Sequence, residues 1–269
     1  KINDKNNEKN NIYGLFYLKG HEKYSKIADE SFEYYLYTKE IECPVCFSKI
    51  NVKKIRNSRL SLKKIRNDLR PIYKNFKPYW YKIWICSQCF YTALKRDFFD
   101  LNKKKRKKIK KQFKDKVQGI LGPNYTPNFS QPRELNQVFN SYYLAIKLHK
   151  LIEDSKDKLT YLWLRLSWLY EDVDEKELSE KASYKAMEYL RDFYFNNDST
   201  RLSPGQQDKL TLLLSILFHK HGFAKEAVPL LSNLIHSHQT KSIHKRRARD
   251  LFIKIRDLQR NDEKNKHKK

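Results

Sequence analysis

The stretches Cys43-Pro44-Val45-Cys46 and Cys86-Ser87-Gln88-Cys89 hold all four cysteines of the 269-residue chain. Two cysteines separated by two residues can turn both sulfurs toward one ion, and two such turns complete a tetrahedron of thiolates. The spacing therefore predicts one metal site formed by Cys43, Cys46, Cys86 and Cys89. We expect one structural Zn²⁺ there, because four thiolates leave no open position for a substrate water.

Three other uses of the cysteines stay open at this point. A redox CxxC pair usually stands alone near a βαβ pattern, which is not visible here. Two disulfides would need an oxidising compartment and are typical of small secreted domains. An iron–sulfur cluster usually has more closely spaced ligands. Phe47 and Phe90 follow the two pairs, where glycine is common, so each turn either avoids positive φ or carries strain.

The composition bounds the class of protein. The length allows one large or two modest domains, and 39% hydrophobic residues can form a core. We see no secretory signal and no run approaching the ~20 apolar residues of a membrane span. Reduced thiolates favour a cytoplasmic location, and a first residue of Lys leaves a removed leader open. The net charge of +26 indicates an acidic partner such as nucleic acid or an anionic membrane, or simply a Lys-rich proteome.

The first 99 residues divide into two predicted regions. Residues 1–40 begin with a polar, disordered start and continue as an aromatic-rich extension that could pack on the metal module. Residues 41–99 form a zinc-ribbon-like module. Alternating apolar and basic residues predict half-buried strands over 50–65, and the repeated KKIRN at 53–57 and 63–67 suggests that these two strands pair. The aromatic run 79–85 predicts a strand leading into Cys86.

Basic residues of the module and of the following segment are candidate nucleic-acid contacts. Residues 100–132 comprise a Lys-rich arm and, at 119–132, a domain boundary that contains Gly and Pro. The arm is either a phosphate-binding element or a charged linker helix. The candidate contacts are Lys53, Lys54, Arg56, Arg59, Lys63, Lys64, Arg66, Lys103, Lys104, Lys105, Arg106, Lys107 and Lys108.

The rest of the chain is predicted to be helical. Apolar residues recur at helical spacing in six segments of residues 133–260, and residues 261–269 form a frayed basic tail. Leu214, Phe218, Gly222 and Ala227 follow the tetratricopeptide pattern, as does a second unit that starts at Trp163. We expect an α+β, mostly α fold, with a small zinc-ribbon-like β module followed by a short tetratricopeptide-like α-helical solenoid. An ordinary helical bundle is the alternative.

The motifs together resemble a bacterial family of unknown function that joins a CPxC…CxxC zinc module to a tetratricopeptide-like region. The resemblance rests on the two cysteine pairs, KKIRNSRL, KPYWYKIWIC, RDFFD at 96–100 and LWLRLSWLYED at 162–172, and it covers residues 41–260. This chain departs from the family in lacking glycine after each pair. The resemblance implies the architecture and the metal, but no activity.

No catalytic motif is evident, so we expect a non-enzymatic protein. Four histidines, at 219, 221, 236 and 238, have a spacing that turns neighbours to different helix faces, and the acidic residues 172–177 are expected to form a solvated turn. We predict a zinc-stabilised scaffold or adaptor that binds protein partners through its helical-repeat surface. The alternative is sequence-tolerant RNA or DNA binding by the basic module and arm. The oligomeric state is left open.

Overall fold

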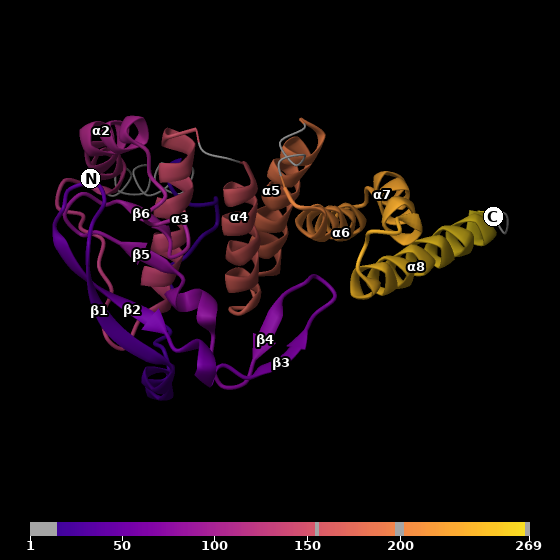
Figure 1. The fold of residues 1–269 in the computed structure, drawn as a ribbon, viewed down its shortest axis with the longest axis horizontal. Coiled ribbons are helices and arrows are strands. Elements are labelled where there is room, and N and C mark those ends of the chain that lie inside the picture. The colour runs from indigo at the N-terminus through magenta and orange to yellow at the C-terminus, as the bar shows by residue number, and fades with distance from the viewer. Residues whose placement is uncertain (1–14, 154–155, 197–201, 267–269) are drawn as a thin grey trace, which may run out of the picture.

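The computed structural model describes residues 15–153, 156–196 and 202–266. The predicted disordered start, residues 1–11, therefore lies outside the described residues. The described chain is α+β and mostly α, with small antiparallel sheets at one end and a row of helices leading away from them (Figure 1).

Three two-stranded antiparallel hairpins form the β region, and two of them carry a cysteine pair at their turn. The hairpins are joined by short 3₁₀ helices. The elements are η1 (Glu30–Tyr35), β1 (Leu36–Glu42), β2 (Lys49–Ile55), η2 (Asn57–Arg59), β3 (Leu62–Ile65), β4 (Pro71–Tyr73), η3 (Pro78–Tyr81), β5 (Ile83–Ile85) and β6 (Thr92–Leu94).

The predicted strands exist, but their predicted pairing is wrong. β2 pairs with β1, so that Ile41 lies opposite Ile50, and β3 pairs with β4 instead of with β2. The repeated KKIRN motif therefore marks two neighbouring strands that belong to different hairpins. Connection length does not decide the pairing, because residues 56–61 between β2 and β3 are as many as residues 43–48 between β1 and β2. The local turns differ instead: the cysteine turn closes back from Cys43 to Ser48, whereas the 3₁₀ turn η2 leads the chain out of β2.

The predicted strand before Cys86 is shorter than expected. Pro78 starts a 3₁₀ turn in which Tyr79, Trp80 and Tyr81 are all buried, and β5 begins only at Ile83. Proline at the first position of a helical turn has a φ already suited to it. Consecutive aromatic side chains of this turn are therefore all buried, whereas a half-buried strand would bury only every second one.

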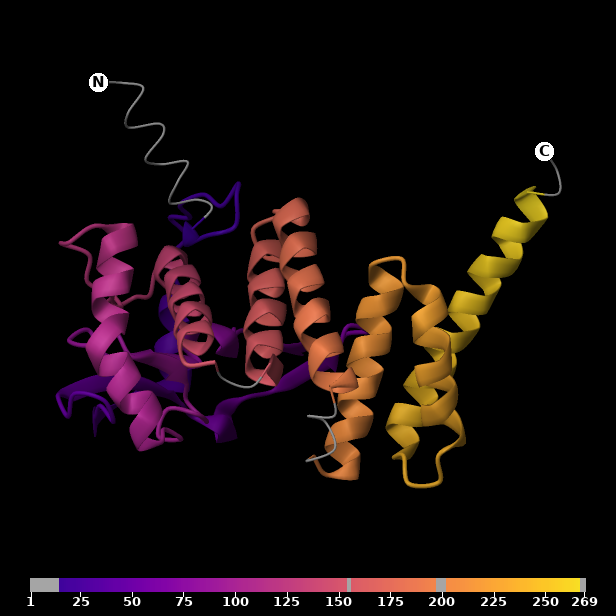
Figure 2. The ribbon, with the colours of Figure 1, turned by 90° about the horizontal axis from the view of Figure 1, so that it is seen from above.

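The helices stand side by side in chain order, and each packs against the next (Figure 2). Six of them fall on the segments predicted to be helical from residue 133 onward, and the basic arm forms a helix before them. The helices are α2 (Lys103–Leu121), α3 (Leu135–Leu151), α4 (Lys156–Glu171), α5 (Lys176–Phe195), α6 (Pro204–Lys220), α7 (Ala224–His236) and α8 (Ser242–Lys266).

Helix α8 runs further than expected, because the segment predicted to be a frayed tail is helical as far as Lys266. In the turn between α6 and α7, Gly222 has a φ of 84°. Ala227 and Leu231 are fully buried where the two helices meet. The small residue permits the close approach, and glycine permits the left-handed backbone.

The aromatic-rich N-terminal segment packs against two parts of the molecule. Phe32 contacts Phe76 of the β region, as expected for an extension of the metal module. Earlier residues instead reach the helices: the Tyr17 hydroxyl donates a 2.8 Å hydrogen bond to Asn140 of α3, and His21 bonds to the Tyr170 hydroxyl of α4 at 2.8 Å. Burial of His21 lowers its pKa to about 4, so it is neutral at pH 7.

One continuous set of buried side chains runs from the β region into the helices, since β5, β6 and η3 pack on α3. The segment from Gly122 to Pro132 contains no helix or strand, but the predicted domain boundaries stay predictions. None of the described helices combines the length and the apolar character that spanning a bilayer requires.

Candidate functional site

The four cysteines meet where the β1–β2 and β5–β6 hairpins bring their turns together. The two turns have the same backbone hydrogen bonds. Cys43 N–H donates to the Ser48 carbonyl at 2.9 Å, and Cys86 N–H donates to the Tyr91 carbonyl at 2.9 Å. In each, the residue after the second cysteine donates back to the first cysteine, from Phe47 at 2.9 Å and from Phe90 at 2.8 Å.

Both phenylalanines adopt the left-handed backbone that glycine usually supplies in such turns. Their φ values are 65° for Phe47 and 63° for Phe90. This conformation costs a non-glycine residue about 1 kcal/mol or more. The two side chains differ in how much their burial can offset this cost, because Phe90 is fully buried and Phe47 is 54% exposed.

The sulfur positions fit one tetrahedral ion. The Sγ atoms of Cys43 and Cys89 lie 3.6 Å apart and those of Cys46 and Cys86 lie 3.5 Å apart. All four lie within 4.8 Å of one another. A tetrahedron with bonds of about 2.3 Å has edges of roughly 3.8 Å. The thiols are free, not disulfide-bonded, and a polynuclear iron–sulfur cluster would need more space between them.

Three of the thiols, those of Cys43, Cys86 and Cys89, share hydrogen bonds that shift their pKa values in opposite directions. Hydrogen bonds from Cys43 and Cys89 lower the pKa of Cys86 to about 2. Hydrogen bonding with Cys86 raises the pKa of Cys43 to about 12, and hydrogen bonds to Cys43 and Cys86 also raise the pKa of Cys89. A Cys86 thiolate that accepts hydrogen bonds from the thiols of Cys43 and Cys89 is the expected ion-free state of these three residues, whereas a bound cation would favour the thiolate form of its ligands.

The basic helix α2 lies against the two cysteine turns. Its buried face is formed by Ile109, Phe113 and Val117. The Arg106 guanidinium lies 5.5 Å from the ring centre of Phe47, and the Lys114 ammonium lies 5.4 Å from that of Phe90. A divalent ion with four thiolates carries a net charge of about −2. Part of the positive charge of α2 would therefore complement such an ion bound by the four cysteines.

The candidate nucleic-acid contacts of the β region differ in whether they already have a partner within the chain. Four of them already have partners within the chain. Lys53 forms a 2.7 Å ion pair with Glu33, and the Arg56 side chain donates to the Leu36 carbonyl. Arg59 donates to the Tyr34 carbonyl and lies over its ring, while Arg66 forms two 2.8 Å bonds with Glu171. Lys54 lies beside the Tyr37 ring.

The remaining candidates are exposed in two separate places. Lys63 and Lys64 lie on β3, where every side chain is exposed. Figure 1 places this hairpin at the opposite end of the β region from α2. On α2, Lys108 pairs with Glu153 at 2.8 Å. The α2 candidates with exposed side chains are Lys103, Lys104 and Lys107, while Lys105 is half-buried. The structure does not gather the candidates into one patch.

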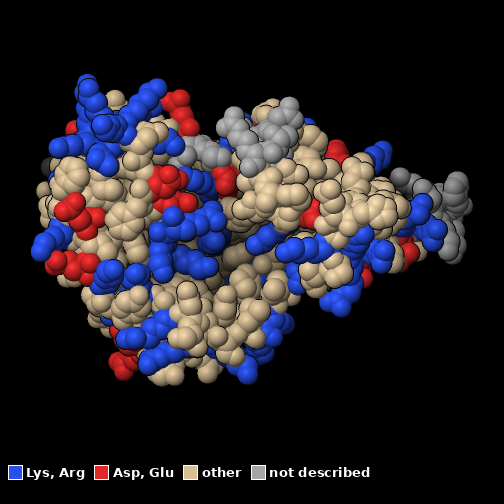
Figure 3. Space-filling view, viewed as in Figure 1, with Lys and Arg blue, Asp and Glu red and all other residues tan. Residues whose placement is uncertain are grey.

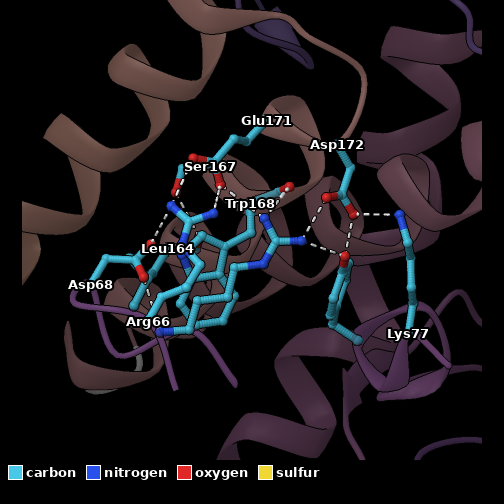
Figure 4. Close-up of polar contacts among 10 residues, drawn as sticks. Arg66, Asp68, Lys77, Leu164, Ser167, Trp168, Glu171 and Asp172 are labelled. Carbon is cyan, nitrogen blue, oxygen red and sulfur yellow. Dashed lines mark hydrogen bonds and ion pairs between the residues drawn. The ribbon is translucent and has the colours of Figure 1, made fainter. Parts of the chain in front are cut away.

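A buried ion-pair network that the sequence did not indicate fastens the β3–β4 hairpin to α4 (Figure 4). Arg70 is only 4% exposed and donates to Glu171 at 2.8 Å and to Asp172 at 2.6 Å. Tyr79 donates to the second oxygen of Asp172, which also accepts a 2.9 Å bond from Lys77. The expectation that Asp172 belongs to a solvated turn is wrong, because a guanidinium from 102 residues away covers it.

The network stabilises the ionised forms of Asp172 and Arg70. Burial alone would raise the pKa of Asp172, but the hydrogen bonds from Tyr79 and Arg70 lower it. Burial alone would lower the pKa of Arg70, but Tyr79, Asp172 and Glu171 together raise it. Each charge thus stabilises the ionised form of the other, as expected for a hydrogen-bonded buried pair.

A cavity of about 630 Å³ lies beside this network, between the β3–β4 hairpin and helices α4, α6 and α8. Figure 3 shows basic side chains gathered around the hollow on this face. Its walls are largely apolar and include Leu164, Trp168 and Leu213. Ile65 and Ile243, which also line it, are 44% and 42% exposed. None of its described lining residues is Asp or Glu, and five are cations: Lys82, Arg165, Lys209, Lys241 and Arg247.

The cations of this cavity lack the carboxylates that surround Arg70. Burial, together with Arg165, Arg96 and Lys209, lowers the pKa of Lys82 to about 8. Burial also lowers the pKa of Arg165, whose Nη1 donates a long 3.4 Å bond to the Tyr161 carbonyl. Lys82 and Arg165 also line a neighbouring cavity of about 400 Å³ with Lys95 and Arg96. Sequence reasoning missed this set, since four separate elements bring it together.

Comparisons with known proteins agree with the predicted family resemblance. A family model described as "Uncharacterized protein conserved in bacteria (DUF2225)" matches residues 36–261. An "Uncharacterized protein" of Borreliella burgdorferi is 29% identical over 161 residues, which cover 55% of this chain and 57% of the relative. The match thus spans little more than half of the relative's length. No solved structure matches the chain.

Proposed function

The chain belongs to the uncharacterised bacterial family DUF2225, and we propose from its own residues that it is a non-enzymatic, zinc-stabilised adaptor for a protein partner. The partner would bind the face that α4, α6 and α8 turn toward the cavity, called here the α4–α6–α8 face. The observation that carries the proposal is this cavity, with its apolar walls and the exposed Ile65 and Ile243. Exposed apolar side chains gathered around a hollow are typical of binding surfaces.

The tetratricopeptide-like architecture is part of the proposal. Helices α4 and α5 would form one unit and α6 and α7 a second, with α8 packed on the end. Trp163, Leu214 and Ala227 stand at the expected repeat positions and are buried, which supports this assignment. In such arrays the first helix of each pair lines the shared binding surface, and this role falls to α4, α6 and α8.

Zinc is proposed as the resident ion because four closely placed thiolates suit it, and such a site is stable in a reducing compartment such as the cytoplasm. Metal analysis of the purified chain should find one zinc per chain. Cys86→Ser should lower both metal content and thermal stability, because metal-binding energy contributes to folding. Retention of metal and melting temperature by the variant would refute the site, and iron in place of zinc would correct the ion.

The adaptor role is tested by photo-crosslinking in native lysate. A photoreactive residue replaces Ile243 on the α4–α6–α8 face, and a control carries it at Ile253, an exposed position of α8 that does not line the cavity. We expect a partner that crosslinks from position 243 only and that binds the full chain when purified. Equal crosslinking from both positions, or none from 243, would count against the proposed face.

Nucleic-acid binding is the second candidate, because Lys63 and Lys64 on β3 and Lys103 and Lys107 on α2 are exposed and have no hydrogen-bond or ion-pair partner among the described residues. Such binding should depend steeply on salt and little on sequence. Titration with labelled single-stranded RNA and duplex DNA at about 50 mM salt measures it, near the low end of the range over which phosphate contacts weaken. Undetectable affinity for both would exclude this candidate.

A further inference from the structure

We propose that the cation-lined cavity binds an acidic peptide segment of a partner protein, with an aliphatic side chain of that segment seated between Ile65 and Ile243. This inference rests on the proposed adaptor function and names the chemistry of the partner. The cavity lies between α4, α6, α8 and the β3–β4 hairpin, and its volume of about 630 Å³ lies within the usual range for ligand sites.

Charge is the first argument for an acidic ligand. Five cations line the cavity, and its described lining residues include no carboxylate. Of the nearby acidic groups, Asp97 pairs with Arg96 at 3.3 Å, and Asp208 accepts a 3.0 Å hydrogen bond from Thr240 through Oδ1, while its buried Oδ2 has no hydrogen-bond partner among the described residues. Neither carboxylate lines the cavity, so two carboxylates outside it stand against five cations in its lining. Bringing like charges together in a partly buried place is costly unless an anion compensates them. Ligand carboxylates would supply that compensation.

The depth of the cations supports the same conclusion. Lys82 and Arg165 lie at the inner end, between the two cavities, while Lys209 and Lys241 are exposed. The Lys82 ammonium has no hydrogen-bond or ion-pair partner among the described residues. A charged group held in a low-dielectric place without a partner would bind a ligand carboxylate more strongly than an exposed lysine would.

The apolar residues favour a peptide over a nucleic acid. Single-stranded nucleic acids stack their bases on exposed aromatic rings. Four aromatic residues line the cavity, and none of them is fully exposed. Tyr79 and Trp168 are 8% and 9% exposed, and the guanidinium of Arg70 lies within 6 Å of both ring centres. Tyr73 and Tyr161 are half-buried, and the guanidinium groups of Arg96 and Arg165 lie 5.1 and 5.6 Å from the ring centre of Tyr161. The exposed apolar side chains of the cavity are instead aliphatic, namely Ile65 and Ile243. They match an aliphatic residue placed among Asp and Glu.

Fluorescence anisotropy of the full, metal-loaded chain tests the proposal. The probe is a labelled octapeptide with two central Leu flanked by Asp and Glu, and its control has Asn and Gln in place of the acids. At about 0.1 M salt, where the screening length is about 10 Å, the acidic peptide should bind at least about tenfold more tightly than the control.

Two pairs of variants locate the binding. Lys209→Glu with Arg247→Glu should weaken binding about tenfold or more, whereas Lys103→Glu with Lys107→Glu on α2 changes the net charge equally and should have less than about a twofold effect. Ile243→Ser should weaken binding, and Ile253→Ser should not. Circular dichroism and metal content confirm that each variant is folded.

Three results would overturn the proposal. Equal weakening by both charge variants would mean that the acidic peptide senses only the overall positive charge. A single-stranded oligonucleotide of eight uridines that binds more tightly, and is weakened by Lys209→Glu with Arg247→Glu alone, would make the cavity a nucleic-acid site. Absence of peptide binding while the Ile243 crosslink to a protein partner persists would reject the acidic-peptide inference and leave the adaptor function standing.

Discussion

Two arginines at helix α4, Arg70 of the β3–β4 turn and Arg165 of the helix itself, have opposite electrostatic surroundings. Arg70 donates to Glu171, Asp172 and the Trp168 carbonyl, and these surroundings raise its pKa. Among the described residues, Arg165 donates one hydrogen bond, a long one to a backbone carbonyl, and burial lowers its pKa. Helix α4 thus meets a paired guanidinium from the β3–β4 turn and itself carries an unpaired one at the cavity.

The difference separates fastening from binding. The paired set uses up its charges within the chain and fixes the β3–β4 hairpin to α4. The unpaired set keeps its charges available, at a cost in stability that a ligand could offset. Replacing a residue of the paired set should therefore lower the free energy of unfolding of the chain, and replacing a residue of the unpaired set should raise it. The predictions below test this contrast in order of expected size.

Replacing Arg70 by Met should produce the largest loss. The change leaves Asp172 buried without its guanidinium, and removing one partner of a buried pair typically costs about 3–5 kcal/mol. Urea unfolding at pH 7 measures the free energy of unfolding. Arg70→Lys should recover little of the loss, because one ammonium cannot reach Glu171 and Asp172 in the same fork geometry. A loss below about 1 kcal/mol for Arg70→Met would mean that the network does not fasten the hairpin.

Replacing Asp172 by Asn should produce an intermediate, pH-dependent loss. Hydrogen bonds to a charged group are worth about 1.5–3 kcal/mol each, so a loss of about 2 kcal/mol is expected at pH 7. The folded pKa of Asp172 is lower than its ordinary 3.8, so the wild type keeps this stability above pH 3.8 and loses it as the pH falls below. Unfolding curves of both proteins should therefore converge in acid. A constant difference down to the folded pKa would contradict the assignment.

Replacing Lys82 by Met should have the opposite sign. The folded pKa of about 8 lies below the ordinary 10.5, so the unfolded chain binds the proton more tightly. The charged form is destabilising below pH 8, and the wild type gains stability as the pH rises from about 8 to 10.5. The variant should thus be more stable by about 1 kcal/mol or more at pH 7, with a difference that shrinks over this interval.

Thermal unfolding measured at several pH values checks the Lys82 prediction. The control is Lys95→Met, because Lys95 lines the neighbouring cavity but is exposed, and its removal should change stability little. If Lys82→Met destabilises the chain at pH 7, then Lys82 has a stabilising role, and the contrast between the two sets of cations fails.

The contrast also explains which features could be predicted from the sequence. The cysteine pairs and the helices depend on spacing within a few residues, so Cys43, Cys86 and the helical segments from Leu135 to Leu258 were found. Arg70 follows no periodic pattern, and its partner Asp172 is 102 residues away, so nothing local predicts the pair. The cavity was missed for the same reason, because Lys82, Arg165, Lys209 and Arg247 come from different elements.

The smallest effect on stability is expected for Arg66. Sequence reasoning placed this residue among the nucleic-acid contacts, but the structure places it in the paired set. It forms a two-bond ion pair with Glu171 and a 3.2 Å pair with Asp68, and its side chain is 35% exposed. Ion pairs that water can reach are worth about 0–1 kcal/mol, so Arg66→Gln should cost less than about 1 kcal/mol in urea unfolding. Its charge is already compensated, so any oligonucleotide affinity should fall less with Arg66→Gln than with Lys64→Gln, which removes an exposed charge from the same hairpin. A larger effect from Arg66 would show that the pair with Glu171 opens to bind phosphate, and that even the fastening set contributes to binding.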